Sequence, residues 1–211
     1  VLADQSVPIS HLGPMAVGAI IVVLGSGLLL WPAIALSPWS TKTFIPPMMF
    51  NNVGNMGIPL ILLAFGDEFL AIAVVCFIVE MTLHFSLGIF MINPKMRLLS
   101  ILNQPVMLAT IAGFAVSISG FELPHSVNLP IDMLGQICIP LMLFTLGIRL
   151  TNIEFDDWKV GLAGAILCPV SGILMALVAQ FFLHLPPEQF AVLVVFGALP
   201  PAVLNYMVAE Q

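Results

Sequence analysis

The chain has 211 residues, of which 60% are hydrophobic and 8% charged, and its mean hydropathy is +1.13. Soluble domains are about half apolar and about a quarter charged, so no soluble fold could hide this much apolar surface from water. The formal net charge is −6, and the five Lys and Arg residues form no basic patch, which excludes a nucleic-acid partner. The composition predicts a membrane protein whose surroundings are the lipid bilayer.

Windows of about 20 residues, the length that crosses the hydrocarbon as a helix, predict seven spans. They cover residues 13–36, 44–65, 69–91, 101–119, 130–150, 159–183 and 189–209. The connections are short and rich in Pro, Gly, Asn and charges, so residues 1–211 are expected to form one all-α membrane unit without a soluble domain.

All five basic residues fall on one side when the spans are numbered alternately. They are Lys42, Lys95, Arg97, Arg149 and Lys159. Because cytoplasmic loops carry an excess of Lys and Arg, this side is predicted to be cytoplasmic and the chain to start outside. We therefore expect a multi-pass protein of the cell membrane, either a bacterial inner membrane or a plasma membrane.

The second predicted span is interrupted by the sequence F-N-N-V-G-N-M-G-I-P-L, residues 50–60. Unpaired backbone groups are costly in hydrocarbon, so unwound peptide persists at membrane depth only where protein or a water-filled cavity satisfies it. A single Asn can simply join helices, and a single Pro can be a tolerated kink. The cluster favours a broken helix that lines a polar site; the residues assigned to this site are Asn51, Asn52, Gly54, Asn55, Gly57 and Pro59.

The seventh predicted span contains a second interruption, where Pro200 and Pro201 remove two backbone donors and Asn205 follows one turn later. The two interrupted spans are an odd number of spans apart, so they cross the membrane in opposite directions, as in an inverted-topology repeat. An offset of 146 residues superposes the first span on the sixth, aligns Phe50 with Phe196 and brings the two interruptions together.

Several motifs together resemble the auxin efflux carrier family, which includes plant PIN carriers and bacterial permeases for small organic acids. They are N-N-V-G-N-M-G-I-P-L followed by A-F-G-D-E, N-Q-P-V-M-L opening the fourth span, I-P-L-M-L-F-T-L-G-I-R-L closing the fifth, and A-L-P-P-A-V in the seventh. The resemblance covers the chain from about residue 13 to its end. It implies an inverted-repeat secondary transporter of ten helices whose two broken helices cross.

On that map the chain supplies seven of ten helices, the third to the ninth, and its start at Val1 and its end at Gln211 favour a piece of a longer protein. The resemblance further implies a transport domain with halves at residues 13–91 and 159–209, and scaffold helices at 101–150. Dimerisation of two copies through the scaffold is implied in the same way.

The interruptions suit an anionic ligand. Half-helices that begin near the bilayer midplane direct partial positive charge from their N-termini into the cavity, and Asn side chains add amide donors. No Lys or Arg lies in the middle of a span, so a bound carboxylate would depend on these neutral groups. We expect a small organic acid as the substrate.

Glu80 and His84 stand four residues apart on one face of the third span. Intramembrane ionisable residues are candidates for function, and this pair could exchange a proton during transport. The alternative is a structural pair that ties the third helix to the unwound backbone of the second. The sequence leaves open whether the coupling ion is H⁺ or Na⁺.

Motifs for catalysis and metal binding are missing from the sequence. There is no H-E-x-x-H and no G-x-S-x-G, and Cys76, Cys138 and Cys168 stand singly without metal-like spacing. We expect neither an enzyme nor a metal or other cofactor. The function predicted is secondary active transport by alternating access; the alternative is an ion channel or a seven-helix receptor-like protein.

Overall fold

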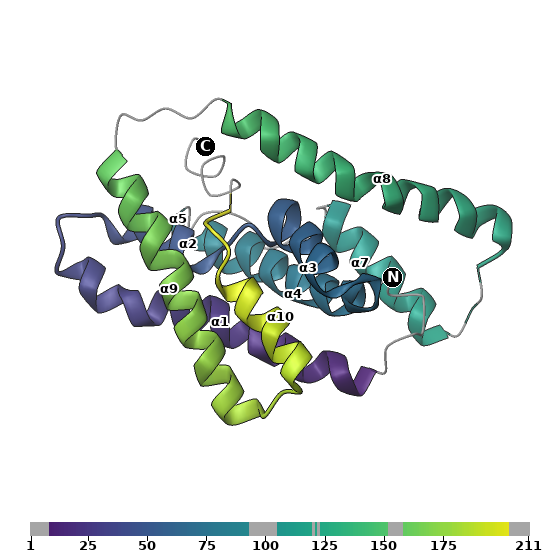
Figure 1. Ribbon diagram of the computed structural model, residues 1–211, viewed down its shortest axis with the longest axis horizontal. Coiled ribbons are helices and arrows are strands. Elements are labelled where there is room, and N and C mark those ends of the chain that lie inside the picture. The colour runs from purple at the N-terminus through teal and green to yellow at the C-terminus, as the bar shows by residue number, and fades with distance from the viewer. Residues whose placement is uncertain (1–8, 93–104, 120, 122, 152–157, 203–211) are drawn as a thin grey trace.

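The computed structural model describes residues 9–92, 105–119, 121, 123–151 and 158–202, and every regular element in these ranges is a helix (Figure 1). The longer α-helices are α1 (Ile9–Ala35), α4 (Leu70–Leu83), α7 (Pro105–Ser119), α8 (His125–Leu150) and α9 (Trp158–Leu183). The shorter ones are α2 (Thr41–Met49), α3 (Ile58–Phe65), α5 (Ile89–Ile92) and α10 (Pro187–Gly197). Two π-helical turns, η1 (Val53–Gly57) and η3 (His84–Gly88), and one 3₁₀ turn, η2 (Asp67–Phe69), connect them.

Four stretches of the described chain are long and apolar enough to cross a membrane: Leu12–Ala35, Asp67–Met91, His125–Ile148 and Gly161–Leu183. They correspond to the first, third, fifth and sixth predicted spans. The second and seventh spans yield the shorter apolar helices Val53–Phe65 and Pro187–Gly197, because both are interrupted. α7 covers most of the fourth span, whose residues 101–104 lie outside the described chain. The prediction of an all-helical membrane protein is confirmed.

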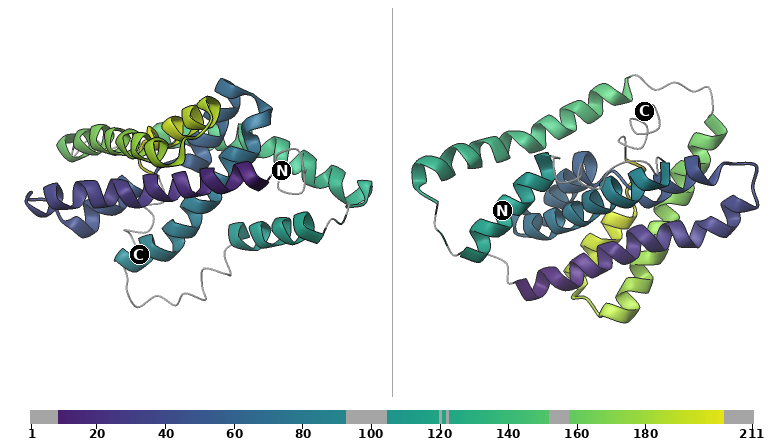
Figure 2. Two further views of the ribbon diagram at one scale, coloured as in Figure 1. Left: turned by 90° about the horizontal axis from the view of Figure 1, so that it is seen from below. Right: turned by 180° about the vertical axis from the view of Figure 1, so that it is seen from behind.

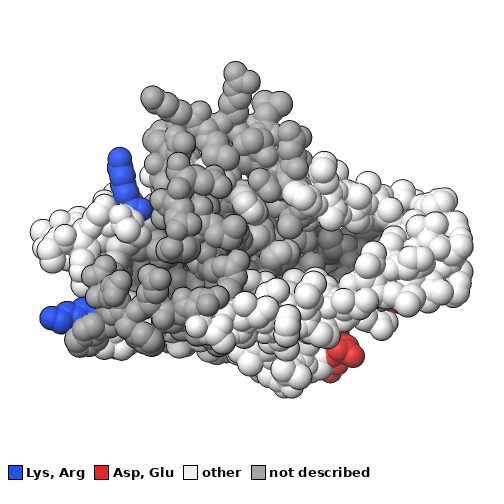
Figure 3. All heavy atoms as spheres, turned by 90° about the horizontal axis from the view of Figure 1, so that it is seen from above, with Lys and Arg blue, Asp and Glu red and all other residues white. Residues whose placement is uncertain are grey.

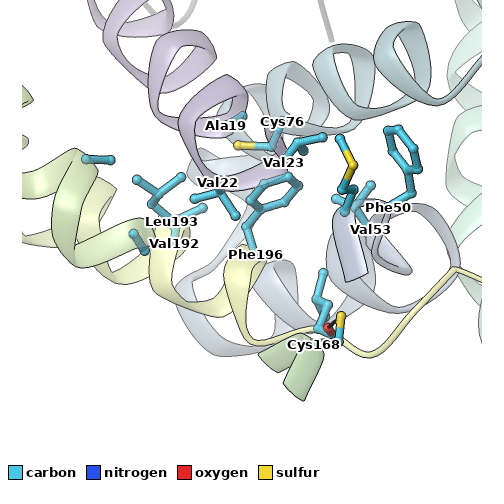
Figure 4. Close-up of a cluster of buried hydrophobic side chains, with 14 of the residues drawn as sticks. Ala19, Val22, Val23, Phe50, Val53, Cys76, Cys168, Val192, Leu193 and Phe196 are labelled. Atoms are coloured by element: carbon cyan, nitrogen blue, oxygen red, sulfur yellow. Dashed lines mark hydrogen bonds between the residues drawn. The ribbon is translucent and has the colours of Figure 1, made fainter. Parts of the chain in front are cut away.

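The core lies where α1 packs against α9, α2 and α4, and where α10 packs against α9. Figure 2 shows α1 in one layer and α9 with α10 in the next. Figure 4 shows Val22 and Val23 of α1, Cys76 of α4 and Phe196 of α10 meeting in this core, with Phe50 close by. Two helices that precede an interruption therefore end in the same buried cluster.

α8 lies at the edge of the molecule, where it contacts η1 and α3 (Figure 1). None of the residues in its apolar stretch is buried, and large side chains such as Leu134 and Phe144 are exposed.

Figure 3 shows the blue Lys and Arg side chains at one end of the molecule and red Asp and Glu side chains toward the other. The charges visible in that view thus lie toward the two ends, as expected for a protein with an apolar belt.

Candidate functional site

The first interruption is shorter than the sequence predicts. α2 ends at Met49, and the chain is extended at Phe50 (φ −104°, ψ 104°). The chain winds again from Val53, because the carbonyl of Asn52 accepts hydrogen bonds from the backbone N–H groups of Met56 (3.2 Å) and Gly57 (3.1 Å). Gly54, Asn55 and Gly57 therefore lie inside a π-helical turn rather than in unwound peptide, and Pro59 stands in the first turn of α3.

The second interruption follows α10, which ends at Gly197. The backbone N–H of Ala198 still reaches the carbonyl of Val194 at 2.9 Å, and the chain then leaves the helix. Pro200 and Pro201 have no backbone N–H, so neither can donate the hydrogen bond that would extend α10. Asn205, which the sequence places after this break, lies outside the described residues.

The two interruptions are hydrogen-bonded to each other. Asn51 and Pro201 form an antiparallel bridge. The N–H of Asn52 donates to the carbonyl of Pro200 at 2.8 Å, and the N–H of Ala202 donates to the carbonyl of Phe50 at 2.9 Å. Each unwound segment thus satisfies backbone groups of the other, which is what extended peptide requires at membrane depth.

The three asparagines of the first interruption differ in their surroundings. The side-chain Nδ2 of Asn51 donates to the carbonyl of Phe196 at 2.6 Å, and Asn51 is buried. Asn52 is also buried and Asn55 is half-buried; neither side chain makes a hydrogen bond within the described residues. The amides of Asn52 and Asn55 are therefore available to a ligand in a way that the Asn51 amide is not.

Two glycines of η1 allow close packing around the break. A Cβ at Gly57 would lie 2.6 Å from Cδ1 of Leu199, a residue of the second interruption. A Cβ at Gly54 would lie 3.0 Å from Cε2 of Phe77 on α4. Gly57 thus lets the two interruptions approach each other, and Gly54 is tightly packed against α4.

Glu80 and His84 are brought together as their spacing predicts. Oε1 of Glu80 lies 3.6 Å from Nδ1 of His84, and the two residues are 0% and 2% exposed. Neither Glu80 oxygen has a hydrogen-bond partner in the described part of the chain. The ring of His84 stacks on that of Phe50, with centroids 4.4 Å apart and an interplanar angle of 8°. The pair therefore packs against Phe50, whose carbonyl accepts one of the hydrogen bonds that join the interruptions.

A backbone contact that the sequence does not predict joins Gly172 of α9 to Gly197 of α10. A Cβ at Gly172 would lie 2.7 Å from the Gly197 carbonyl carbon and closer still to its oxygen. The two backbones therefore touch at the end of α10. Next to this contact, the thiol of Cys168 points to the carbonyl of Leu199, at 3.5 Å. Gly172 stands in the middle of α9 and Gly197 is the one glycine of α10, so no signal in the sequence pairs them.

These features define an all-helical membrane protein in which two interrupted helices are joined through their backbones. Residues 93–211 match a family described as "Membrane transport protein", and the chain belongs to this family. The resemblance to auxin efflux carriers is thereby confirmed at the level of the family, and membership points to transport rather than to an enzymatic role.

A protein of Rhizobium meliloti (strain 1021) named "Putative malonate transporter" is 27% identical over 179 residues, which cover 77% of this chain. The matched region is 55% of that protein, so the chain spans about half the length of the curated relative. No solved structure matches the chain.

Proposed function

We propose that this chain forms the greater part of a bacterial PIN-like permease, a secondary active transporter that moves a small organic anion across the cell membrane by alternating access. The observation that carries the proposal is the pair of backbone hydrogen bonds between the two interruptions. Carriers of this kind bind their substrates near the midplane, where half-helix ends and unwound backbone supply polar groups inside an apolar protein.

An inverted repeat is supported by the lengths of the helices. The offset of 146 residues carries α1 to residues 155–181, and α9 spans Trp158–Leu183. It carries α2 to residues 187–195, and α10 spans Pro187–Gly197. α1 and α2 thus form a first hairpin, and α9 and α10 form a second. In each hairpin a long helix is followed by a short helix that ends at an interruption. We propose that these hairpins are equivalent parts of two inverted repeats whose broken helices cross.

The substrate proposed is a small carboxylic acid in its anionic form. The first N–H groups of a helix lack intrahelical acceptors and attract anions, and η1 begins at Val53 directly beside the bridge. The described Lys residues, Lys42 and Lys159, are exposed near the starts of α2 and α9 rather than at the interruptions. The name of the Rhizobium relative, a malonate transporter, adds support for a dicarboxylate.

We assign the ligand contacts to the amides of Asn52 and Asn55, with Asn205 as the amide of the second interruption. The remaining residues of the site shape it: Gly54, Gly57, Pro59, Pro200 and Pro201 set where the backbone turns and how closely the two segments approach. Weak, neutral contacts of this kind suit a carrier, which must release what it binds.

For Glu80 and His84 we propose a role in coupling transport to the proton gradient. The pair is buried, its carboxylate has no hydrogen-bond partner among the described residues, and His84 contacts Phe50 of the first interruption. A proton taken up by this pair would change the charge next to the site. If the pair is purely structural, its replacement changes stability without changing the response to ΔpH.

For the whole protein we propose a transport domain with halves at residues 13–91 and 159–209 that moves against scaffold helices at 101–150. Two copies would associate through that scaffold. The exposed apolar surface of α8 agrees with contact to lipid or to other helices.

The proposal is tested by reconstituting the full-length protein in proteoliposomes and measuring uptake of radiolabelled malonate and other small dicarboxylates. A carrier gives saturable flux and accelerated exchange when unlabelled substrate is present on the opposite side. Currents far above carrier turnover would indicate a channel, and an absence of both flux and binding for every organic acid tested would refute the assignment.

A further inference from the structure

The end of α10 is capped by the side chain of Asn51, a residue of the first interruption that lies 145 positions before Phe196 in the sequence. The last carbonyls of a helix have no intrahelical donor and must find one elsewhere. For Phe196, the N–H of Leu199 is a distant donor at 3.5 Å, whereas Nδ2 of Asn51 lies at 2.6 Å from the same carbonyl oxygen. Phe196 is 0% and Asn51 4% exposed, so water does not readily replace this bond.

The cap operates in one direction only. The offset of 146 residues places Gly197 opposite Asn51 in the second hairpin. A side chain at that position is excluded, because its Cβ would lie 2.5 Å from the carbonyl oxygen of Gly172. The first interruption therefore contributes a side-chain donor, Asn51, to the end of α10. The equivalent position, Gly197, has no side chain, which lets α10 approach α9.

The chemistry of Asn51 is poorly suited to binding an anion. One of the two Nδ2 hydrogens of Asn51 is committed to Phe196, and its Oδ1, which is buried without a hydrogen-bond partner among the described residues, can only accept. A carboxylate offers acceptors alone, so this side chain could give it at most the one remaining N–H and would also present an oxygen that repels it. Asn52 and Asn55 carry no such commitment of their amides.

We propose that Asn51 is a positioning residue that fastens the end of α10 to the first interruption, so that the two broken helices move as one body during transport, and that it does not contact the substrate. The part concerning transport rests on the proposed function. The part concerning the fastening does not, because it concerns only hydrogen bonds between two segments of the protein.

The first test measures hydrogen exchange in the full-length protein in lipid nanodiscs. Asn51→Ala removes the cap, and the bridging amides of Asn52 and Ala202 should then exchange about tenfold faster or more, since a buried carbonyl has lost its shortest donor and keeps only the long one from Leu199. Asn55→Ala is the matched control and should leave both amides unchanged. Equal exchange in wild type and Asn51→Ala would overturn the proposal.

The second test separates positioning from substrate contact by kinetics. We expect Asn51→Ala to lower Vmax of organic-acid uptake about tenfold while KM stays within about twofold, whereas Asn55→Ala raises KM. A raised KM with unchanged Vmax in Asn51→Ala would make Asn51 a ligand and refute the inference. If wild type transports no organic acid, the proposed function fails, and the exchange experiment still decides on the fastening.

Asn51→Leu serves as the control for effects of the cavity in Asn51→Ala. It also lacks a donor, but its side chain fills the volume that Ala leaves empty. It should reproduce the faster exchange of Asn51→Ala. If neither variant folds, the Nδ2 protons of Asn51 in wild type are measured by NMR: slow exchange supports the bond to Phe196, and exchange as fast as that of an exposed asparagine overturns it.

Discussion

The contact between α9 and α10 at Gly172 and Gly197 gives the sharpest prediction for mutagenesis. In Gly172→Ala the new Cβ would lie 2.7 Å from the carbonyl carbon of Gly197, and nonbonded carbons prefer about 3.5–4.0 Å. The obstacle is backbone, which cannot rotate away as a side chain does. α10 must therefore move by about 1 Å relative to α9.

A displacement of this size reaches the bridge between the interruptions. The hydrogen bonds from Asn52 to Pro200 and from Ala202 to Phe50 are 2.8 Å and 2.9 Å long, and about 1 Å more would take them beyond hydrogen-bonding range. Overpacking costs about 1–3 kcal/mol, and each lost hydrogen bond about 0.5–1.5 kcal/mol. With two bonds lost, we expect Gly172→Ala to lose about 2–6 kcal/mol of stability and most of the uptake.

The assay is thermal unfolding of the purified full-length protein together with uptake in proteoliposomes. Gly161→Ala in the same helix is the matched control, because a Cβ at Gly161 meets no atom within 4 Å. Alanine there should be neutral or stabilise the helix by up to about 1 kcal/mol. If Gly172→Ala unfolds at the same temperature and transports at the same rate as Gly161→Ala, the inference that the backbones of α9 and α10 touch at Gly172 and Gly197 is refuted.

Three further predictions concern the site itself. Glu80→Gln keeps the size of the side chain but cannot exchange a proton, so uptake should lose its response to ΔpH while counterflow persists; an unchanged response would discard the coupling role. Asn55→Ala and Pro59→Ala should each abolish uptake at low substrate concentration, while membrane fractionation shows normal insertion. Wild-type flux in both variants would remove these residues from the site. Phe50→Leu removes the ring that stacks on His84 and should lower the uptake rate about tenfold at unchanged expression, which initial-rate measurements can check.

Much of the fold follows from the sequence because lipid imposes simple rules. Long apolar stretches must be helices, so the spans containing α1, α4, α8 and α9 could be located by hydropathy alone. The interruptions could be located as well, since a cluster of Asn and Gly is unusual in such a stretch and the offset of 146 residues pairs it with Pro200 and Pro201; a double proline by itself does not end a helix, because Pro46 and Pro47 lie inside α2. The offset that aligned Phe50 with Phe196 also indicated two helices ending in equivalent places.

The details of the interruptions could not be predicted, because they depend on tertiary contacts. The Asn-Gly segment suggests unwound peptide, yet residues Val53–Gly57 are wound as a π-helix once the carbonyl of Asn52 accepts two donors. The stacking of Phe50 on His84 and the bond from Asn51 to Phe196 join residues that sequence spacing does not relate. In the sequence the three asparagines of the first interruption look alike. The hydrogen bond to Phe196 distinguishes Asn51 from Asn52 and Asn55, and it depends on the tertiary fold.

The measurement that tests the central claim most directly is an experimental structure of the full-length protein in a lipid nanodisc with a transported organic acid bound. The account predicts density for the acid beside the bridge, within hydrogen-bonding distance of Asn52 or Asn55, while the Asn52–Pro200 and Ala202–Phe50 bonds remain. An acid bound away from both interruptions, or interruptions separated by lipid, would contradict it.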